Sequence, residues 1–331
     1  MPAVIRAATT EDVPRMVELL LADARERRAE DAVLWTVADD AAAQVERAVT
    51  FALTAEAQPF RQFWQVAEEG GRVSCVVHSM LLPVPPIYAG AEGEPGLILP
   101  DSFVAPDAPV GTLEALVEAA EATLRGAGAR IVLSSFVTGQ TWEAAFEGRS
   151  YDPLTLYLSR TELGDAAMPS GVRPATEADV PGIVARSAEN RAVLFDIDPF
   201  WAIHPEADAR FDAWMRRSLT LPDRDMLVMG PAEALEGYVI AQPASRLHFP
   251  PAHGITGTGV IDDFYHPDLA DPDTLADGGT GATALLRAAE AAFAERGLST
   301  AFVVCPAGWR SKSRMLEAAG YETAMVWSIK R

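Results

Sequence analysis

The chain has 331 residues, of which 49% are apolar, and this length suits two domains of about 150–170 residues better than one. Its formal charge of −20 disfavours nucleic acid and anionic membranes as partners. The charge fits a cationic or amine-bearing substrate, and it also fits a heavily solvated acidic surface. There is no apolar run near about 18 residues and no export signal, so the sequence predicts a soluble, cytoplasmic protein. Cys75 and Cys305 lie in apolar, strand-like runs, which indicates buried free thiols.

The predicted elements begin with a short strand at Val4–Arg6, followed by a helix capped by Thr9 or Thr10. Hydrophobic patterning then predicts a second helix over Ala41–Leu53 and two strands, followed by a strand, a helix, a strand, a short helix and a closing strand. The two strands are predicted at 62–68 and 72–82, the next strand at 101–107 and the helix around 119–121. The following strand is predicted at 130–134, the short helix at 140–147 and the closing strand from Tyr151.

The same pattern then repeats. Residues 5–20 read IRAATTEDVPRMVELL, and residues 172–187 read VRPATEADVPGIVARS. Later segments correspond too, with elements predicted at 207–219, 225–229, 235–242, 260–265, 279–296, 300–305, 310–319 and from Tyr321. Each half therefore reads β-α-α-β-β-β-α-β-α-β, an α/β fold with mixed sheets. Residues 160–171 form the best linker, which predicts domains at 1–162 and 170–331.

The stretch from Gly259 to Ala294 carries the most specific signal. A β-branched and aromatic strand, Val260–Tyr265, is followed by an acidic loop, a turn of small residues at 278–282 and an apolar-periodic helix. Free amides at a helix start bind anions, and small residues let a phosphate approach the backbone closely. A tight turn without any ligand is the alternative interpretation of this pattern.

The order of elements, the opening VRPATEADVPGIV and the tail ERGLSTAFVVCP…MLEAAGYE together resemble the GNAT superfamily of acyl-CoA-dependent N-acyltransferases, in a tandem form. The resemblance implies a V-shaped opening between the strands that end at Tyr265 and Cys305, with the pantetheine arm of acetyl-CoA inside it. The acyl thioester would lie against the 262–266 backbone, and the pyrophosphate on the 278–283 amides. The implied cofactor-binding residues are Phe264, Tyr265, Gly278, Gly279, Thr280, Gly281, Ala282 and Thr283.

The sequence departs from the family pattern in both halves. The Arg or Gln that usually leads the phosphate loop is missing, and Asp277 stands at the head of the loop instead. Arg310 and Lys312, which open the last helix, are candidates to pair with the CoA phosphates in its place. Trp309 and Leu316 stand where the family often has an Asn and a Tyr. In the first half the loop reads Pro109-Val-Gly-Thr-Leu113, which predicts a degenerate domain that binds CoA weakly or not at all.

Asp262 and Asp263 are the candidate catalytic bases, because a carboxylate beside the acyl group can take a proton from an incoming ammonium group. Successive strand side chains face opposite ways, so only one of them is expected to reach a given cleft. The alternative is a strand-end Asp that binds loop amides. His266 is a third candidate acid or base, or else a surface histidine. Trp201 and His204 are candidate substrate-binding residues, whereas Trp214 fits core packing.

The five histidines show no metal-ligand spacing, so no metal is expected. The sequence therefore predicts an N-acetyltransferase whose second half transfers an acetyl group from acetyl-CoA to a small-molecule amine by direct attack. The alternative is a non-catalytic CoA-binding or protein-interaction module that keeps the fold. Two GNAT-like halves in one chain also predict a monomer that acts as an internal pseudo-dimer.

Overall fold

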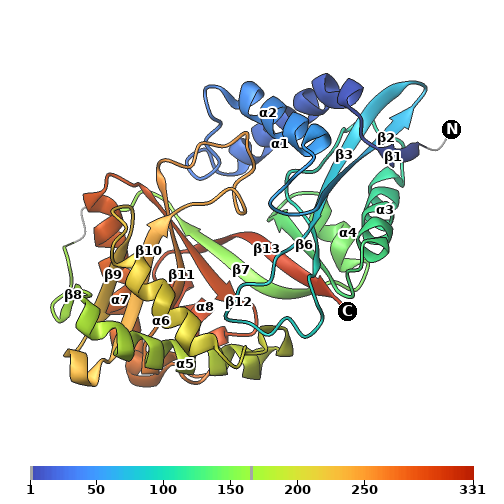
Figure 1. Cartoon of the computed structure of the whole chain (residues 1–331). Coiled ribbons are helices and arrows are strands. Elements are labelled where there is room, and N and C mark those ends of the chain that lie inside the picture. The colour runs from blue at the N-terminus through green and yellow to red at the C-terminus, as the bar shows by residue number, and fades with distance from the viewer. Residues whose placement is uncertain (1–2, 165–166) are drawn as a thin grey trace.

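The computed structural model describes residues 3–164 and 167–331 and shows two α/β lobes joined through the middle by strands (Figure 1). Residues 165 and 166, in the predicted linker, and residues 1 and 2 lie outside this description. The first half runs through β1 (Val4–Ala7), α1 (Val13–Glu30), α2 (Ala41–Thr54), β2 (Gln62–Glu69), β3 (Arg72–Leu81), β4 (Gly96–Ile98), β5 (Phe103–Val104), α3 (Thr112–Gly126), β6 (Val132–Val137), α4 (Trp142–Glu147) and β7 (Asp152–Arg160).

The second half repeats this order. It runs through β8 (Val172–Pro174), α5 (Val180–Ile197), α6 (Ala207–Ser218), β9 (Asp225–Met229), β10 (Gly237–Pro243), β11 (Thr258–Tyr265), α7 (Thr280–Glu295), β12 (Thr300–Pro306), α8 (Arg310–Ala318) and β13 (Glu322–Lys330). The element order predicted from the repeat is confirmed. One local difference is that the strand expected around 101–107 is only the two-residue β5, and β4 precedes that range.

Both halves begin with the same capping structure. Asp12 accepts hydrogen bonds from the backbone and side chain of Thr9 at 2.8 and 3.0 Å, and Arg6 binds it at 2.7 and 2.8 Å. In the second half Asp179 accepts from Thr176 at 2.8 Å twice and from Arg173 at 2.8 and 2.6 Å. A carboxylate that accepts several hydrogen bonds fixes the start of the helix, which explains why this short motif recurs so closely in the sequence.

The described strands form one mixed sheet in the order β1-β2-β3-β4-β6-β13-β7-β12-β11-β10-β9-β8, with β5 paired to β3. The last strand of each half lies next to the penultimate strand of the other half: β13 pairs with β6, and β7 pairs with β12. β7 and β13 also pair with each other, antiparallel, at the centre of the molecule (Figure 1). We call this arrangement the strand exchange, and it makes a single sheet of what the repeat alone suggests are two.

Helices cover both faces of the sheet. In the first half α1 and α2 pack over Val66 and Val76, whereas α3 and α4 pack over the other face at Cys75 and Val77. This alternation along β3 is the period-2 burial of a strand that is covered on both sides. In the second half the largest apolar cluster joins α5, α6, α7 and α8 to the sheet.

Two loops cross between the halves. The crossing loop (residues 82–95) leaves the first half and binds the second, where the amide of Ala89 donates to the Ala202 carbonyl at 2.7 Å and Tyr88 pairs with Ile203. The return loop (residues 244–257) leaves the second half and binds the first, where Val37 pairs with His253. The two loops occupy equivalent places in the repeat, so each half covers part of the other.

The V-shaped opening implied by the resemblance is present. β11 and β12 are parallel and pair only from Thr258–Ile261 to Thr300–Val303. Beyond Ile261, β11 continues to Tyr265 and β12 to Pro306 without pairing to each other. The acid pair (Asp262 and Asp263) therefore lies at the point where the strands separate.

Candidate functional site

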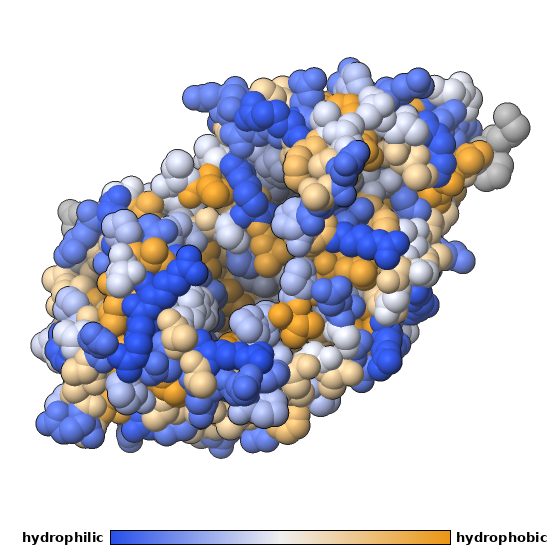
Figure 2. Space-filling model, viewed as in Figure 1, coloured by the Kyte–Doolittle hydropathy of each residue, from blue (hydrophilic) through white to orange (hydrophobic). Residues whose placement is uncertain are grey.

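A central pocket of about 810 Å³ lies between the two halves. The space-filling view shows the molecule hollowed between the lobes, with apolar surface inside the hollow (Figure 2). This volume is typical of a site for a small molecule. The first half contributes the crossing loop and β7, and the second half contributes α5, the 199–202 turn, β11 and α8. Neither half alone encloses the pocket.

Both members of the acid pair border this pocket, which corrects the expectation that only one of them reaches a given cleft. The reason is a β-bulge. Ile240 of β10 lies opposite Asp263, but Gln242 lies opposite Val260, so β11 holds one extra residue between these pairs. A bulge breaks the strict alternation of a strand and lets two successive side chains share one side.

Asp262 is the more accessible acid. Its side chain is exposed to the pocket, and its Oδ2 accepts a hydrogen bond from Nε2 of Gln242 at 2.7 Å. Burial within the cavity raises the pKa of Asp262 to about 7, and the neighbouring charge of Asp263 adds to the rise. A carboxylate that titrates near neutral pH is well matched to accepting a proton from an ammonium group.

Asp263 is held more tightly. Its Oδ1 accepts hydrogen bonds from Nδ2 of Asn190 on α5 at 2.9 Å and from the hydroxyl of Tyr238 on β10 at 2.5 Å. Burial also raises the pKa of Asp263. Among the described residues neither Asp262 nor Asp263 makes an ion pair, so both depend on neutral donors.

Lys312 is buried and does not lie on the surface, where a residue that binds CoA phosphates was expected. It is 3% exposed and borders the central pocket; its Nζ donates to the carbonyl of Phe264 at 3.3 Å and lies 4.0 Å from the Phe264 ring centroid. Burial lowers the pKa of Lys312, while the charges of Asp263 and Asp262 oppose that change. The lysine predicted to bind CoA phosphates therefore sits beside the acid pair.

Of the predicted substrate-site and core residues, two tryptophans border the pocket and one histidine does not. Trp201 borders the pocket, and its ring centroid lies 5.3 Å from that of Tyr88 and 4.8 Å from that of Phe200. Trp214, expected in the core, is 37% exposed and also borders the pocket. His204 does not border it: its Nδ1 accepts a hydrogen bond from the amide of Glu206 at 3.0 Å, in the turn that precedes α6.

The start of α7 has a resident carboxylate. Oδ2 of Asp268 accepts hydrogen bonds from the amides of Gly281 at 2.8 Å and Ala282 at 3.2 Å, and Asp268 is 4% exposed. Asp277, Gly278 and Gly279 precede the helix with φ of 47°, 64° and 70°. Glycines with positive φ lie in this turn, as the sequence predicts. However, the amides of Gly281 and Ala282, two of those expected to bind a diphosphate, already bind the side chain of Asp268. The pyrophosphate site stays a prediction, and it requires Asp268 to move.

His266 and Gly281 lie in contact. A Cβ added at Gly281 would lie 2.3 Å from Cε1 of His266, so the small residue makes room for the imidazole. Nδ1 of His266 accepts a hydrogen bond from the amide of Asp268 at 3.2 Å. Nδ1 of His266 also lies 3.0 Å from Oδ1 of Asp268. His266 does not border the central pocket, and its catalytic role remains a prediction.

The other predicted cofactor residues are dispersed. Tyr265 is 2% exposed, with its ring centroid 6.5 Å from that of Trp309, and Arg310 pairs with Asp273 at 2.6 Å. Thr280 is exposed and donates to the carbonyl of Asp277 at 3.0 Å, and Thr283 is half-buried. Arg310 and Thr280 do not border the central pocket, whereas the carbonyl and ring of Phe264 contact Lys312.

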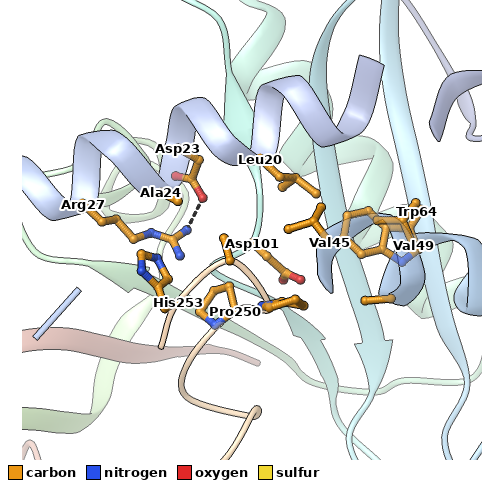
Figure 3. Close-up of a pocket in the computed structure, with 13 residues that line it drawn as sticks. Leu20, Asp23, Ala24, Arg27, Val45, Val49, Trp64, Asp101, Pro250 and His253 are labelled. Carbon is orange, nitrogen blue, oxygen red and sulfur yellow. Dashed lines mark hydrogen bonds and ion pairs between the residues drawn. The ribbon is translucent and has the colours of Figure 1, made fainter. Parts of the chain in front are cut away.

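The corresponding place in the first half is filled. Figure 3 shows Arg27 and Asp23 on α1 facing each other, with His253 of the return loop and Asp101 nearby and Trp64 beside Val45 and Val49 at the other end of the pocket. Arg27 is fully buried and binds Asp23 at 2.5 Å, and only about 10 Å³ of space remains. Nδ1 of His78 lies 2.9 Å from both carboxylate oxygens of Asp101. The return loop thus closes the first-half cleft, while the second-half cleft stays open.

Sequence reasoning missed the residues that complete the site: Tyr88, Asn190, Tyr238 and Gln242. Only Tyr88 had a visible signal, because Pro83, Pro85 and Pro86 mark an extended loop that ends in an aromatic residue. The others become partners of the acid pair through strand register and the bulge. Among the described residues there is no cluster of three or more His, Cys, Asp or Glu suited to a metal ion. None of the helices in the described ranges is both long and apolar enough to span a bilayer.

Comparison with solved structures identifies the fold. A GCN5-related N-acetyltransferase from Sphaerobacter thermophilus is similar over 99% of this chain and 95% of its own, with a TM-score of 0.58 and 16% identity. A tandem GNAT protein from the clavulanic acid biosynthesis pathway is similar over 99% of this chain and 97% of its own, with a TM-score of 0.51 and 16% identity. No protein-family model matches the sequence, and no curated protein matches it significantly. The chain has the α/β fold of the GNAT acetyltransferases in its tandem form.

Proposed function

We propose that this chain is an acyl-CoA-dependent N-acyltransferase that transfers an acetyl group from acetyl-CoA to the amine of a small molecule. The observation that carries the proposal is Asp262, an accessible carboxylate with its pKa raised to about 7 by burial, at the point where β11 and β12 separate. The fold alone does not assign an activity, so the chemistry of the side chains around Asp262 has to supply the evidence for one.

In the proposed reaction Asp262 accepts a proton from the ammonium group of the acceptor. The neutral nitrogen attacks the thioester carbonyl, the new C–N bond forms, and the C–S bond breaks to release the CoA thiolate. A backbone amide among residues 264–266 stabilises the oxyanion. Lys312, which is buried one helical turn before Leu316 on α8, gives a proton to the thiolate. The nitrogen releases its second proton as the amide forms, and this proton restores the ammonium group of Lys312. The diverging strands fit the pantetheine arm; the phosphate end fits once Asp268 releases the amides of Gly281 and Ala282.

The test combines thermal melting with and without acetyl-CoA and an assay of thiol release with a panel of amines. A rise in melting temperature together with amine-dependent thiol release supports the proposal. Asp262→Asn is expected to lower kcat by about 10²–10⁴-fold, because a positioned base contributes that much. Glu295→Gln, an exposed change near the end of α7, is the matched control. Absence of both effects overturns the proposal.

The second candidate is a CoA-binding or protein-interaction module without turnover. The observations that favour it are the carboxylate of Asp268 on the α7 amides and Leu316, which cannot donate a proton. A melting shift with acetyl-CoA but no thiol release on any amine indicates this module.

A further inference from the structure

The central pocket has an aromatic wall that is built by both halves. The crossing loop brings Tyr88 against Trp201, and Phe200 stands at a right angle to Trp201. The loop is held there by the Ala89–Ala202 hydrogen bond at 2.7 Å and by a bond of 3.0 Å from the amide of His204 to the carbonyl of Ile87. The wall is therefore a built feature of the folded chain, fixed by backbone pairing.

The aromatic wall lies within electrostatic reach of the acid pair. Burial raises the pKa of the Tyr88 hydroxyl, and the charges of Asp263 and Asp262 raise it further. The same pocket thus has carboxylates on β11 and aromatic rings on the crossing loop and the 199–201 turn. Rings of this kind bind apolar and aromatic groups, and their faces attract cations.

The charges of the side chains that border the central pocket do not sum to zero. Arg191 pairs with Asp208, and Arg331 pairs with Asp198 at 2.5 Å, so these arginines are compensated outside the acid pair. Asp262 and Asp263 carry two negative charges when ionised, and the ammonium of Lys312 balances one of them. Arg224 pairs with Asp223 at 3.1 Å and donates to Oε1 of Gln242 at 3.2 Å. Glu92 and Arg130, which also border the pocket, carry opposite charges. One negative charge is left for a ligand to neutralise, and burying it unpaired is costly.

We propose that the central pocket selects a singly charged amine with a bulky, aromatic body, whose ammonium group binds Asp262 and whose rings pack against Tyr88 and Trp201. The proposal rests on the proposed function, since it names the acceptor class for that same site. It also makes the first half a determinant of acceptor specificity, because Tyr88 belongs to the crossing loop. Anions are disfavoured by the acid pair, and small polar amines leave most of the apolar wall uncovered.

The test is direct binding by calorimetry without acyl-CoA, using 1-naphthylmethylamine, its uncharged analogue 1-naphthylmethanol and the small polar amine ethanolamine. The naphthyl amine is expected to bind at least about 10-fold more tightly than either of the other two. Asp262→Asn should weaken its binding by about 10-fold or more, because a charged hydrogen bond is lost. Tyr88→Ala should weaken it by about 3- to 10-fold, whereas Tyr88→Phe keeps the ring and retains the affinity.

Each outcome decides a separate point. Equal binding of the naphthyl alcohol overturns the role of charge, and equal binding of ethanolamine overturns the role of the aromatic wall. If Asp262→Asn does not fold, the three probes on the unaltered chain decide the question, and the Tyr88→Ala and Tyr88→Phe pair tests the wall independently. A naphthyl amine that binds as expected but is never acetylated counts against the proposed function and leaves the pocket's selectivity standing.

Discussion

At the scale of single residues, Asp262 and Asp268 make opposite contributions to the candidate site. Asp262 is a carboxylate that the fold keeps accessible within the pocket, and the neutral side chain of Gln242 donates a hydrogen bond to it. Asp268 is almost fully buried and takes two helix amides that an incoming anion needs. The proposed reaction therefore requires the first acid to be ionised and the second to be displaced.

The pH dependence of turnover should report on Asp262. Its pKa lies near 7 because burial disfavours the charge, so at lower pH it is protonated and cannot act as a base. We expect kcat/KM for an amine to rise as the pH increases through about 7, and Asp262→Asn to abolish that rise. The charges that face Asp262 are those of Asp263, Lys312 and Arg224, and none of these is altered in the variant. A profile that keeps its rise near 7 in Asp262→Asn places the base elsewhere.

The capping aspartates give a stability prediction. Hydrogen bonds from Arg6 are the main cause that lowers the pKa of Asp12 to about 2, below its value in the unfolded chain of about 4. A lowered pKa stabilises the fold above about pH 4, and this contribution is lost as the pH falls toward 2. Asp12→Asn should lower the free energy of unfolding at pH 7 by about 1–3 kcal/mol and flatten its dependence on pH in that window.

The measurement is urea unfolding at several pH values, with Asp179→Asn as a matched variant in the other half. Hydrogen bonds from Arg173 likewise lower the pKa of Asp179, so the two variants should behave alike. Stabilities that stay unchanged in both variants show that the capping motif is dispensable.

At the scale of elements, the start of α7 combines tight packing with the predicted pyrophosphate site. The Gly281→Val side chain would lie against His266, since even a Cβ would come within 2.3 Å of its ring. We expect the imidazole to be displaced into the space above the helix amides, and acetyl-CoA affinity to fall by about 10-fold or more. Calorimetry measures this, and Gly257→Ala is the control, because its added Cβ lies 3.8 Å from Ser299.

Adding His266→Ala to Gly281→Val separates two causes. If the loss comes from the displaced ring, the double variant should recover affinity, and the two changes should not be additive. If the loss persists, the valine itself blocks the approach of the diphosphate. Full affinity in a folded Gly281→Val protein would falsify the assignment of this turn to the phosphate.

Elements were the level at which the sequence was most informative. The apolar period of residues 279–296 predicted α7 within a residue or two, and the repeat predicted the order of elements in both halves. Partners in the sheet were not predictable, because the alternation along β7 and β13 is the same whichever strand lies beside them. Asp262 and Asp263 stand out in the sequence and both border the pocket, while their catalytic role stays a prediction. The bulge that turns both into the pocket depends on pairing with β10, which no local pattern records.

At the scale of the whole molecule, the strand exchange affects how the chain can be divided. A fragment of residues 170–331 lacks β7, which pairs on one side with β12 and on the other with β13. The fragment also lacks β6, the other neighbour of β13, so β12 has one unpaired edge and β13 has two. We expect it to be poorly soluble, because it exposes these edges and the apolar face that meets the first half. Coexpression with residues 1–162 should restore solubility. A soluble, active fragment on its own contradicts this expectation.

Assembly and ligand number are predicted together. Because the halves already pair with each other through β7 and β13, the full chain should be a monomer in solution. With its first-half cleft closed by the return loop, it should bind one CoA per chain. Light scattering gives the mass and calorimetry the number of sites. Two CoA molecules per chain would show that the first half, despite Val110 and Pro109 at its α3 start, has a working site.

The strand exchange also bears on how the protein is made. On the ribosome, β6 and β7 emerge long before β13, which belongs between them. The roughly 170 residues from Arg160 to Lys330 take about 10–30 seconds to synthesise at typical rates. During that interval the nascent first half can pair β6 with β7 directly, as a domain standing alone would do. Wherever that pairing forms, the final strand has to replace it, and insertion of β13 then competes with a self-contained first domain.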